Sequence, residues 1–162
     1  MTAEIDVQAS GAHGVVACQG GNMAGWSLYI DESGRPTYHY NWFGHVHSVL
    51  ADSEKLQPGR HEIVVDFAYD GGFGAGGTAT LFVDRRTAGS MRIEKTVPLV
   101  YSMSGETFDI GVDTGSPVGN YPHLFTCTAD IIGVTIERLD EPSASTKQKM
   151  REGEFRASIS TQ

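Results

Sequence analysis

The sequence has little cysteine and no long apolar run. Its two cysteines, Cys18 and Cys127, lie far apart, each inside an apolar stretch. A disulfide framework is therefore not implied, and we expect two buried free thiols, with a single bridge between them as the alternative. The longest apolar runs span only a few residues, far short of the roughly 20 that a membrane-spanning helix needs.

Basic residues are also scarce. Twelve Lys and Arg stand against 20 Asp and Glu, which gives a formal net charge of −8 and a pI of about 5.1. Such a surface repels phosphate backbones, so we expect no nucleic-acid partner. The opening MTAEIDVQAS has neither a basic start nor an apolar stretch and is not a signal peptide. We therefore expect a cytoplasmic protein if the chain is full length.

Glycine is abundant, with 20 residues, and most of it separates runs that alternate between apolar and polar side chains. Alternation with a period of two predicts strands with one buried and one wetter face. It occurs in GWSLYID, RHEIVVDFAYD, TATLFVD and TFDIGVD, and further strands are expected at residues 13–19, 36–43, 48–51, 89–97 and 124–139. Nine short strands between glycine-rich turns predict an all-β fold, an antiparallel sandwich or jelly roll.

The connections carry turn chemistry. DESG at 31–34 predicts a hairpin, and DGGFGAGG at 70–77 predicts either a mobile loop or one whose backbone is closely approached. After Pro142 a helix is expected at 146–160, so residues 1–141 would form the sandwich and 142–162 a short C-terminal helical tail. This helix would carry few apolar residues, so we expect it to be stable only when it packs on the sandwich or on a second copy in a homodimer.

The densest cluster of functional side chains is YHYNWFGHVH at 38–47. Its aromatic residues could line an open sheet face that stacks on a sugar or a flat apolar ligand, or they could simply fill the core. The candidate ligand-binding residues are Trp26, Tyr38, Tyr40, Asn41, Trp42 and Asp70.

Histidines in the same cluster offer acid–base chemistry. His45 and His47 form an H-x-H pair that would project from one side of a strand, but no third metal ligand stands at a recognisable spacing. His39 or His45 could act as acid or base if Asn41, Asp70 or Asp109 oriented the ring. The candidate catalytic residues are therefore His39, His45 and Asp109, and the alternative is surface histidines beside a turn.

Two carboxylates, Asp109 and Asp113, are expected on one face of the strand TFDIGVD. Four residues of strand would separate them by roughly 13 Å, too far for a paired-carboxylate dyad. The oxygen-rich residues 111–116 could instead bind Ca²⁺, with Asp109 and Asp113 as candidate ligands, although Asp-Thr-Gly is also an ordinary turn. We expect no organic cofactor.

Five strings in order, GGNMAGWSLYI, YHYNWFG, PGRHEIVVDFAYDGG, GGTATLFVD and TFDIGVDTGSPV, resemble the C-terminal domain of bacterial arylsulfatases. The resemblance covers about residues 14–136 and implies a concanavalin-like antiparallel sandwich that packs beside a large catalytic domain. The sulfatase nucleophile lies in a C/S-x-P-S-R setting, which neither Cys18 nor Cys127 has. The resemblance therefore implies no sulfatase activity for this chain alone.

These observations favour an accessory module, related to those domains, that works by packing or by ligand contact. Two alternatives remain open. One is a small cofactor-independent enzyme of isomerase, cyclase or lyase type, and the other is a lectin-like domain that binds carbohydrate.

Overall fold

Alternating side chains build ten β-strands in the computed structural model, which describes residues 1–98 and 107–137. The strands are β1 (Thr2–Val7), β2 (Gly14–Gly20), β3 (Gly25–Ile30), β4 (Pro36–Trp42), β5 (Val46–Ala51), β6 (Gly59–Tyr69), β7 (Gly77–Val83), β8 (Arg86–Ile93), β9 (Phe108–Ile110) and β10 (Asp130–Thr135). The expected helix at 146–160 lies outside the described residues. Within them, no helix is long and apolar enough to cross a membrane.

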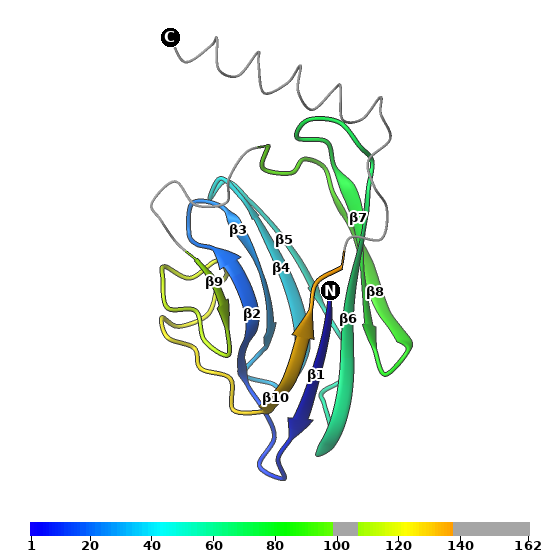
Figure 1. Cartoon of the computed structure of the whole chain (residues 1–162), viewed down its shortest axis with the longest axis vertical. Coiled ribbons are helices and arrows are strands. Elements are labelled where there is room, and N and C mark those ends of the chain that lie inside the picture. The colour runs from blue at the N-terminus through cyan, green and yellow to red at the C-terminus, as the bar shows by residue number, and fades with distance from the viewer. Residues whose placement is uncertain (99–106, 138–162) are drawn as a thin grey trace.

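The strands form two five-stranded sheets that face one another (Figure 1). The first sheet has the order β10-β1-β6-β7-β8 and the second the order β5-β4-β3-β2-β9, and the paired strands run antiparallel throughout both. The predicted all-β antiparallel sandwich is confirmed.

The core lies between the inner faces of the sheets. Ile5, Leu28, Ile63 and Leu81 come from four different strands and are fully buried there. Burying a side chain of this size stabilises the fold by about 1.5 to 3 kcal/mol. The inward faces predicted for β3, β6 and β7 are confirmed at these positions.

Strand β1 was not predicted. It lies between β10 and β6, and its Ala3, Ile5 and Val7 are at most 2% exposed. Because Glu4 and Asp6 separate these residues, the period-two signal is present, but it spans only six residues at the start of the chain. The strand completes the middle of the first sheet.

Strand β9 is shorter than expected, and the side chains on its inner side are not buried because β9 is the edge strand of its sheet. Phe108 and Ile110, predicted to face the core, are 41% and 50% exposed. The strand ends at Ile110 because Gly111 has a positive φ of 83° and turns the chain away from the sheet. Residues 124–129, predicted as strand, also lie outside the strands, since β10 begins only at Asp130.

Glycines in the β6–β7 connection allow close backbone approach. A Cβ on Gly77 would stand 2.5 Å from the ring of Phe67, and one on Gly76 would stand 2.3 Å from the Ile93 carbonyl oxygen. The chain therefore folds tightly on itself here, and the Asp70 carboxylate at its start is bound by Arg92 of β8.

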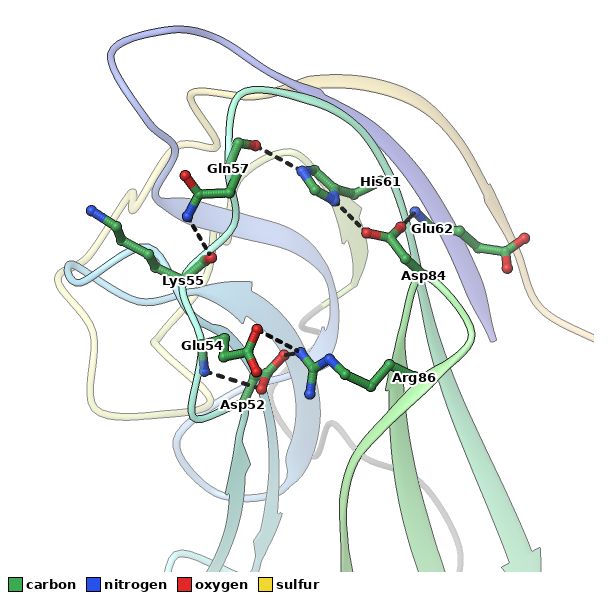
Figure 2. A network of polar contacts seen from close by, with 8 residues as sticks. All are labelled: Asp52, Glu54, Lys55, Gln57, His61, Glu62, Asp84 and Arg86. Carbon is green, nitrogen blue, oxygen red and sulfur yellow. Dashed lines mark hydrogen bonds and ion pairs between the residues drawn. The ribbon is translucent and has the colours of Figure 1, made fainter.

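Polar contacts tie the β5–β6 crossover to the β7–β8 hairpin (Figure 2). Asp52, 1% exposed, accepts a hydrogen bond from Arg86 at 2.6 Å and another from the Glu54 amide. Asp84 accepts from the Glu62 amide and bonds the His61 ring at 2.7 Å. Because Asp52 follows β5 of the second sheet and Arg86 begins β8 of the first, their bond connects the sheets at one end of the sandwich, whereas the bonds of Asp84 join β6 to the β7–β8 turn within the first sheet.

Candidate functional site

Polar and sulfur-bearing residues form a row across the outer face of the second sheet. Cys18 on β2 pairs with Asp109 on β9 and with Ser27 on β3, and Ser27 pairs in turn with His39 on β4. Directly paired residues point to the same face. We call Asp109, Cys18, Ser27 and His39 the polar row. An outer sheet face would ordinarily be wet, yet Cys18, Ser27 and His39 are at most 1% exposed.

The row is buried because residues 111–129, here called the covering segment, fold over it. The segment leaves the sheet at Gly111 and returns where the Cys127 amide donates to the Gly111 carbonyl at 2.7 Å. It is fastened to β2 by the Val15 amide, which donates to the Phe125 carbonyl at 2.8 Å. In Figure 1 the segment lies on the outer side of β9 and β2.

The covering segment brings its own small apolar core. Val118, Tyr121 and Phe125 pack against Val15, Cys18 and Tyr29 of the sheet. The rings of Tyr29 and Tyr121 lie 4.9 Å apart, and those of Tyr121 and Phe125 lie 5.9 Å apart and are stacked. The second sheet is therefore buried on both faces in this region.

Asp113 anchors the covering segment. Its carboxylate, 1% exposed, accepts hydrogen bonds from the Tyr121 hydroxyl at 2.7 Å and the Val118 amide at 3.2 Å. The prediction that Asp109 and Asp113 stand roughly 13 Å apart along one strand is wrong. Since the turn at Gly111 folds the chain back, their carboxylates and the Cys18 thiol place ligand atoms within 4.8 Å of one another.

This arrangement keeps the Cys18 thiol protonated. Burial, followed by the charges of Asp113 and Asp109, raises the pKa of Cys18 far above its ordinary value. A protonated, buried thiol is a poor nucleophile. Cys18 and Cys127 are both free, as expected from the sequence, and Cys127 is half-buried.

His39 faces a second histidine. Its Nε2 lies 2.7 Å from Nδ1 of His47, so one ring donates and the other accepts. Its Nδ1 is buried and has no hydrogen-bond partner among residues 1–98 and 107–137, and Gly119 lies against it. Burial, and then the neighbouring His47, lowers the pKa of His39 to about 4, so the ring is neutral at neutral pH.

The predicted catalytic residues do not converge. Asp109 and His39 lie at opposite ends of the polar row, three strand spacings or about 14 Å apart, so Asp109 cannot orient the ring. The two histidines of the H-x-H pair are also separated. His45 lies in the turn before β5, whereas the ring of His47 is hydrogen-bonded to the ring of His39.

Asn41 holds the backbone rather than a ligand. Its amide nitrogen donates to the carbonyls of Gly21 and Asn22, at 3.1 and 3.0 Å, and lies 3.3 Å from that of Val118. Its Oδ1 accepts from the Gly44 amide at 2.8 Å. Fully buried, it links β4 to both the β2–β3 turn and the covering segment.

The aromatic face of β4 is filled, not open. Tyr38 and Tyr40 are 7% and 3% exposed and belong to the main core, and Trp26 and Trp42 pack against it. Lys95 lies 5.7 Å from the centre of the Trp42 ring. Tyr38 and Tyr40 thus fill the core, the alternative that the sequence left open, while Trp26 and Trp42 are half-buried.

A surface pocket does occur elsewhere, between the 31–34 hairpin and the covering segment. It has a volume of about 260 Å³ and is lined by Tyr29, Asp31, Glu32, Ser33, Asn120, Tyr121, Pro122 and Phe125. Its aromatic residues are those of the small outer core, and its rim carries carboxylate, hydroxyl and amide groups.

Asp31 is engaged by its own hairpin. Arg35 bonds its carboxylate at 2.7 Å, and the Ser33 and Arg35 amides donate to Oδ1. Burial alone would raise the pKa of Asp31, but these bonds lower it below its usual value. The carboxylate is thus held ionised at the edge of the pocket.

Sequence reasoning did not identify this pocket, nor the grouping of Cys18 with Asp109, Asp113 and Ser27. Residues 111–125 read as a turn followed by irregular chain, and no periodic signal tells where such a segment docks. One available signal was Gly111 directly after an alternating run, because glycine there permits a turn that ends the strand.

No family model and no curated protein matches the chain. Among solved structures, the fold is similar to a native heptameric SAP-like pentraxin from Limulus polyphemus, with a TM-score of 0.46 and 10% sequence identity. The match covers 80% of this chain and 58% of the pentraxin chain, so this chain spans less than two thirds of that protein. The likeness is too partial to transfer a ligand or an assembly, and the sandwich assignment rests on the strand order itself.

Proposed function

We propose that this chain is a non-catalytic β-sandwich module that binds a small neutral polyhydroxylated ligand, such as a single sugar ring, in the pocket beside the covering segment. The observation that carries the proposal is the pairing of aromatic walls with a polar rim in that pocket. At about 260 Å³ the pocket is slightly smaller than the roughly 300 to 1,000 Å³ of sites for larger ligands, which suits one ring.

The lining matches the chemistry of a sugar. Tyr121 and Phe125 offer ring surface to apolar C–H groups, while Asn120, Ser33 and Glu32 offer donors and acceptors to hydroxyls. Asp31 and Glu32 place negative charge at the rim of a chain whose formal net charge is already −8. Neutral sugars are therefore favoured over sulfated or phosphorylated ones.

An accessory role is part of the same proposal. The similarity to arylsulfatase C-terminal domains, together with the absence of the sulfatase nucleophile motif from the sequence, supports a module that positions or contacts ligand beside a catalytic partner. The buried, protonated Cys18 thiol agrees with this non-catalytic role. Turnover of an aryl sulfate by the purified chain would overturn it.

Ligand binding is tested by titrating the purified chain with a panel of neutral and sulfated monosaccharides, followed by NMR shifts and calorimetry. We expect neutral sugars to perturb residues around Tyr121, and Asn120→Ala and Glu32→Gln each to weaken binding about tenfold, the loss expected for one hydrogen bond. Glu4→Gln, an exposed glutamate on β1 of the first sheet, is the matched control and should bind normally. No binding at millimolar sugar, or equal weakening by Glu4→Gln, would refute the proposal.

A further inference from the structure

Packing of the sandwich does not account for the carboxylates at the acidic end of the polar row, where Asp109 and Cys18 lie beside Asp113. Within the described residues, the group of His, Cys, Asp and Glu side chains close enough to share a metal ion is Cys18, Asp109 and Asp113. Pairing of β2 with β9 sets the first two side by side, and the turn at Gly111 brings the third over them. The grouping is thus fixed by register and by backbone conformation.

The carboxylates of this group are not ion-paired in the part of the chain that the structure describes. Neither Asp109 nor Asp113 forms an ion pair with a basic side chain of the described residues, although Asp113 is 1% exposed. Buried carboxylates are ordinarily paired with a cation or coordinate a metal, because hydrogen bonds alone only partly replace water. The site therefore favours a positive ion.

A further donor lies beside the group. The Ser27 hydroxyl is fully buried near the Tyr121 hydroxyl and makes no well-aligned hydrogen bond within the described residues. Ser27 is the direct cross-strand partner of Cys18, on the same face of the sheet. An unsatisfied buried hydroxyl is destabilising, and a metal ion or its bound water would supply the missing partner.

We propose that Cys18, Asp109 and Asp113 form a binding site for a divalent cation of the Zn²⁺ class, with the Ser27 hydroxyl beside the remaining coordination position. A thiolate with two carboxylates suits Zn²⁺, whereas Ca²⁺ takes oxygen ligands only. Ligands around tetrahedral Zn²⁺ lie roughly 3.3 to 3.7 Å apart, so the 4.8 Å group closes by side-chain shifts of about 1 Å.

Neighbouring groups already orient the carboxylates. Thr114 donates to Asp109 through its amide at 2.8 Å and its hydroxyl at 2.6 Å, and Thr107 donates to the other oxygen at 2.9 Å. Tyr121 and Val118 hold Asp113 in the same way. Such outer hydrogen bonds fix ligands for a metal. When the ion binds, the Cys18 sulfur gives up its proton to solvent and donates an electron pair to the metal.

Co²⁺ reports directly on the sulfur, because a thiolate ligand produces a near-ultraviolet charge-transfer band. We expect the band with the wild-type chain and with Cys127→Ser, and its loss with Cys18→Ser. Zn²⁺ should displace Co²⁺ and raise the melting temperature of the first two proteins, and Ca²⁺ should do neither. Absence of the band with the wild type, its retention in Cys18→Ser, or equal stabilisation by Ca²⁺ would overturn the site.

A second measurement needs no variant, and so does not depend on how a substituted chain folds. NMR of the wild-type chain titrated with Zn²⁺ should shift the Cβ resonance of Cys18, whose sulfur becomes a metal-bound thiolate, and leave that of Cys127 unchanged. A shift at both cysteines, or at neither, contradicts the proposal. The inference is independent of sugar binding, which is measured separately in the presence of a chelator.

Discussion

The outer faces of the two sheets differ in what lies on them. On the first sheet, Thr80 and Ser90 of neighbouring strands share a 3.0 Å hydrogen bond that is exposed to solvent. On the second sheet, the corresponding face carries Ser27, His39 and Asn41, all fully buried beneath the covering segment. Polar groups on the first sheet can rely on water, whereas those on the second must find partners inside the protein. The covered face is therefore where substitutions should be most costly, and it borders both proposed sites.

The largest difference between the two faces is expected for Asn41→Ala. The change removes the donor to the buried carbonyls of Gly21 and Val118, each costing about 1 to 3 kcal/mol, so we expect a loss of about 3 kcal/mol in the free energy of unfolding. Thr80→Ala on the open face should cost at most about 0.5 kcal/mol. Urea unfolding measures both, and comparable losses would remove the distinction between the faces.

The next largest effect is on pH dependence. The pKa of His39 is about 4 in the folded chain against 6.5 for an ordinary histidine. The unfolded state therefore binds more protons between these values, and stability should be complete above pH 6.5 and fall by about 2 to 3 kcal/mol as the pH drops to 4.

His39→Gln should remove this component, while His61→Gln, at the half-buried histidine of Figure 2, should keep it. Urea unfolding of the three proteins from pH 7 to 4 gives the comparison. A His39 ring that titrates near 6.5 by NMR would show that the covering segment does not bury it in solution.

A smaller effect should separate two glycines. A Cβ on Gly119 would stand 2.5 Å from Nδ1 of His39, so Gly119→Ala should destabilise the chain by about 1 to 2 kcal/mol through overpacking. On β10 of the first sheet, a Cβ on Gly133 would meet nothing within 4 Å. Gly133→Ala should be neutral or stabilise the chain by up to about 1 kcal/mol. Thermal unfolding ranks the pair, and a reversed order would place His39 away from the covering segment.

The sandwich could be predicted because its main evidence is local. Alternation along residues 63–67 and 79–83 reports directly on which side chains enter the core, and each strand carries that signal within its own few residues. The same logic did not give the exposure of Phe108 and Ile110, which lie on the inner side of the edge strand β9, nor the end of that strand, where Gly111 turns the chain. Periodicity describes a strand but not where it stops.

The candidate sites depend on long-range placement, which periodicity does not encode. Ser27 and Tyr29 alternate with core residues, which is the pattern that exposed residues also show. They are buried only because Tyr121 and Phe125, nearly a hundred residues later in the chain, dock over them. Similarly, Asp109 and Asp113 look distant along an extended chain and meet only because the chain reverses. Sequence reasoning therefore named both carboxylates but missed the thiol and the hydroxyl beside them.

The attachment of the covering segment to β2 also affects how the chain meets other copies of itself. A strand with unpaired amides and carbonyls at the border of a sheet can template the addition of further chains, the first step of cross-β growth. Because β9 has only three residues and pairs with residues 17–19, it would leave the other backbone amides and carbonyls along this side of β2 without a strand partner. The parallel bridge between Val15 and Thr126, with the Val15 amide donating to Phe125, occupies part of that remaining border. The segment that seals the polar face thus also works against self-association along this side of the sandwich.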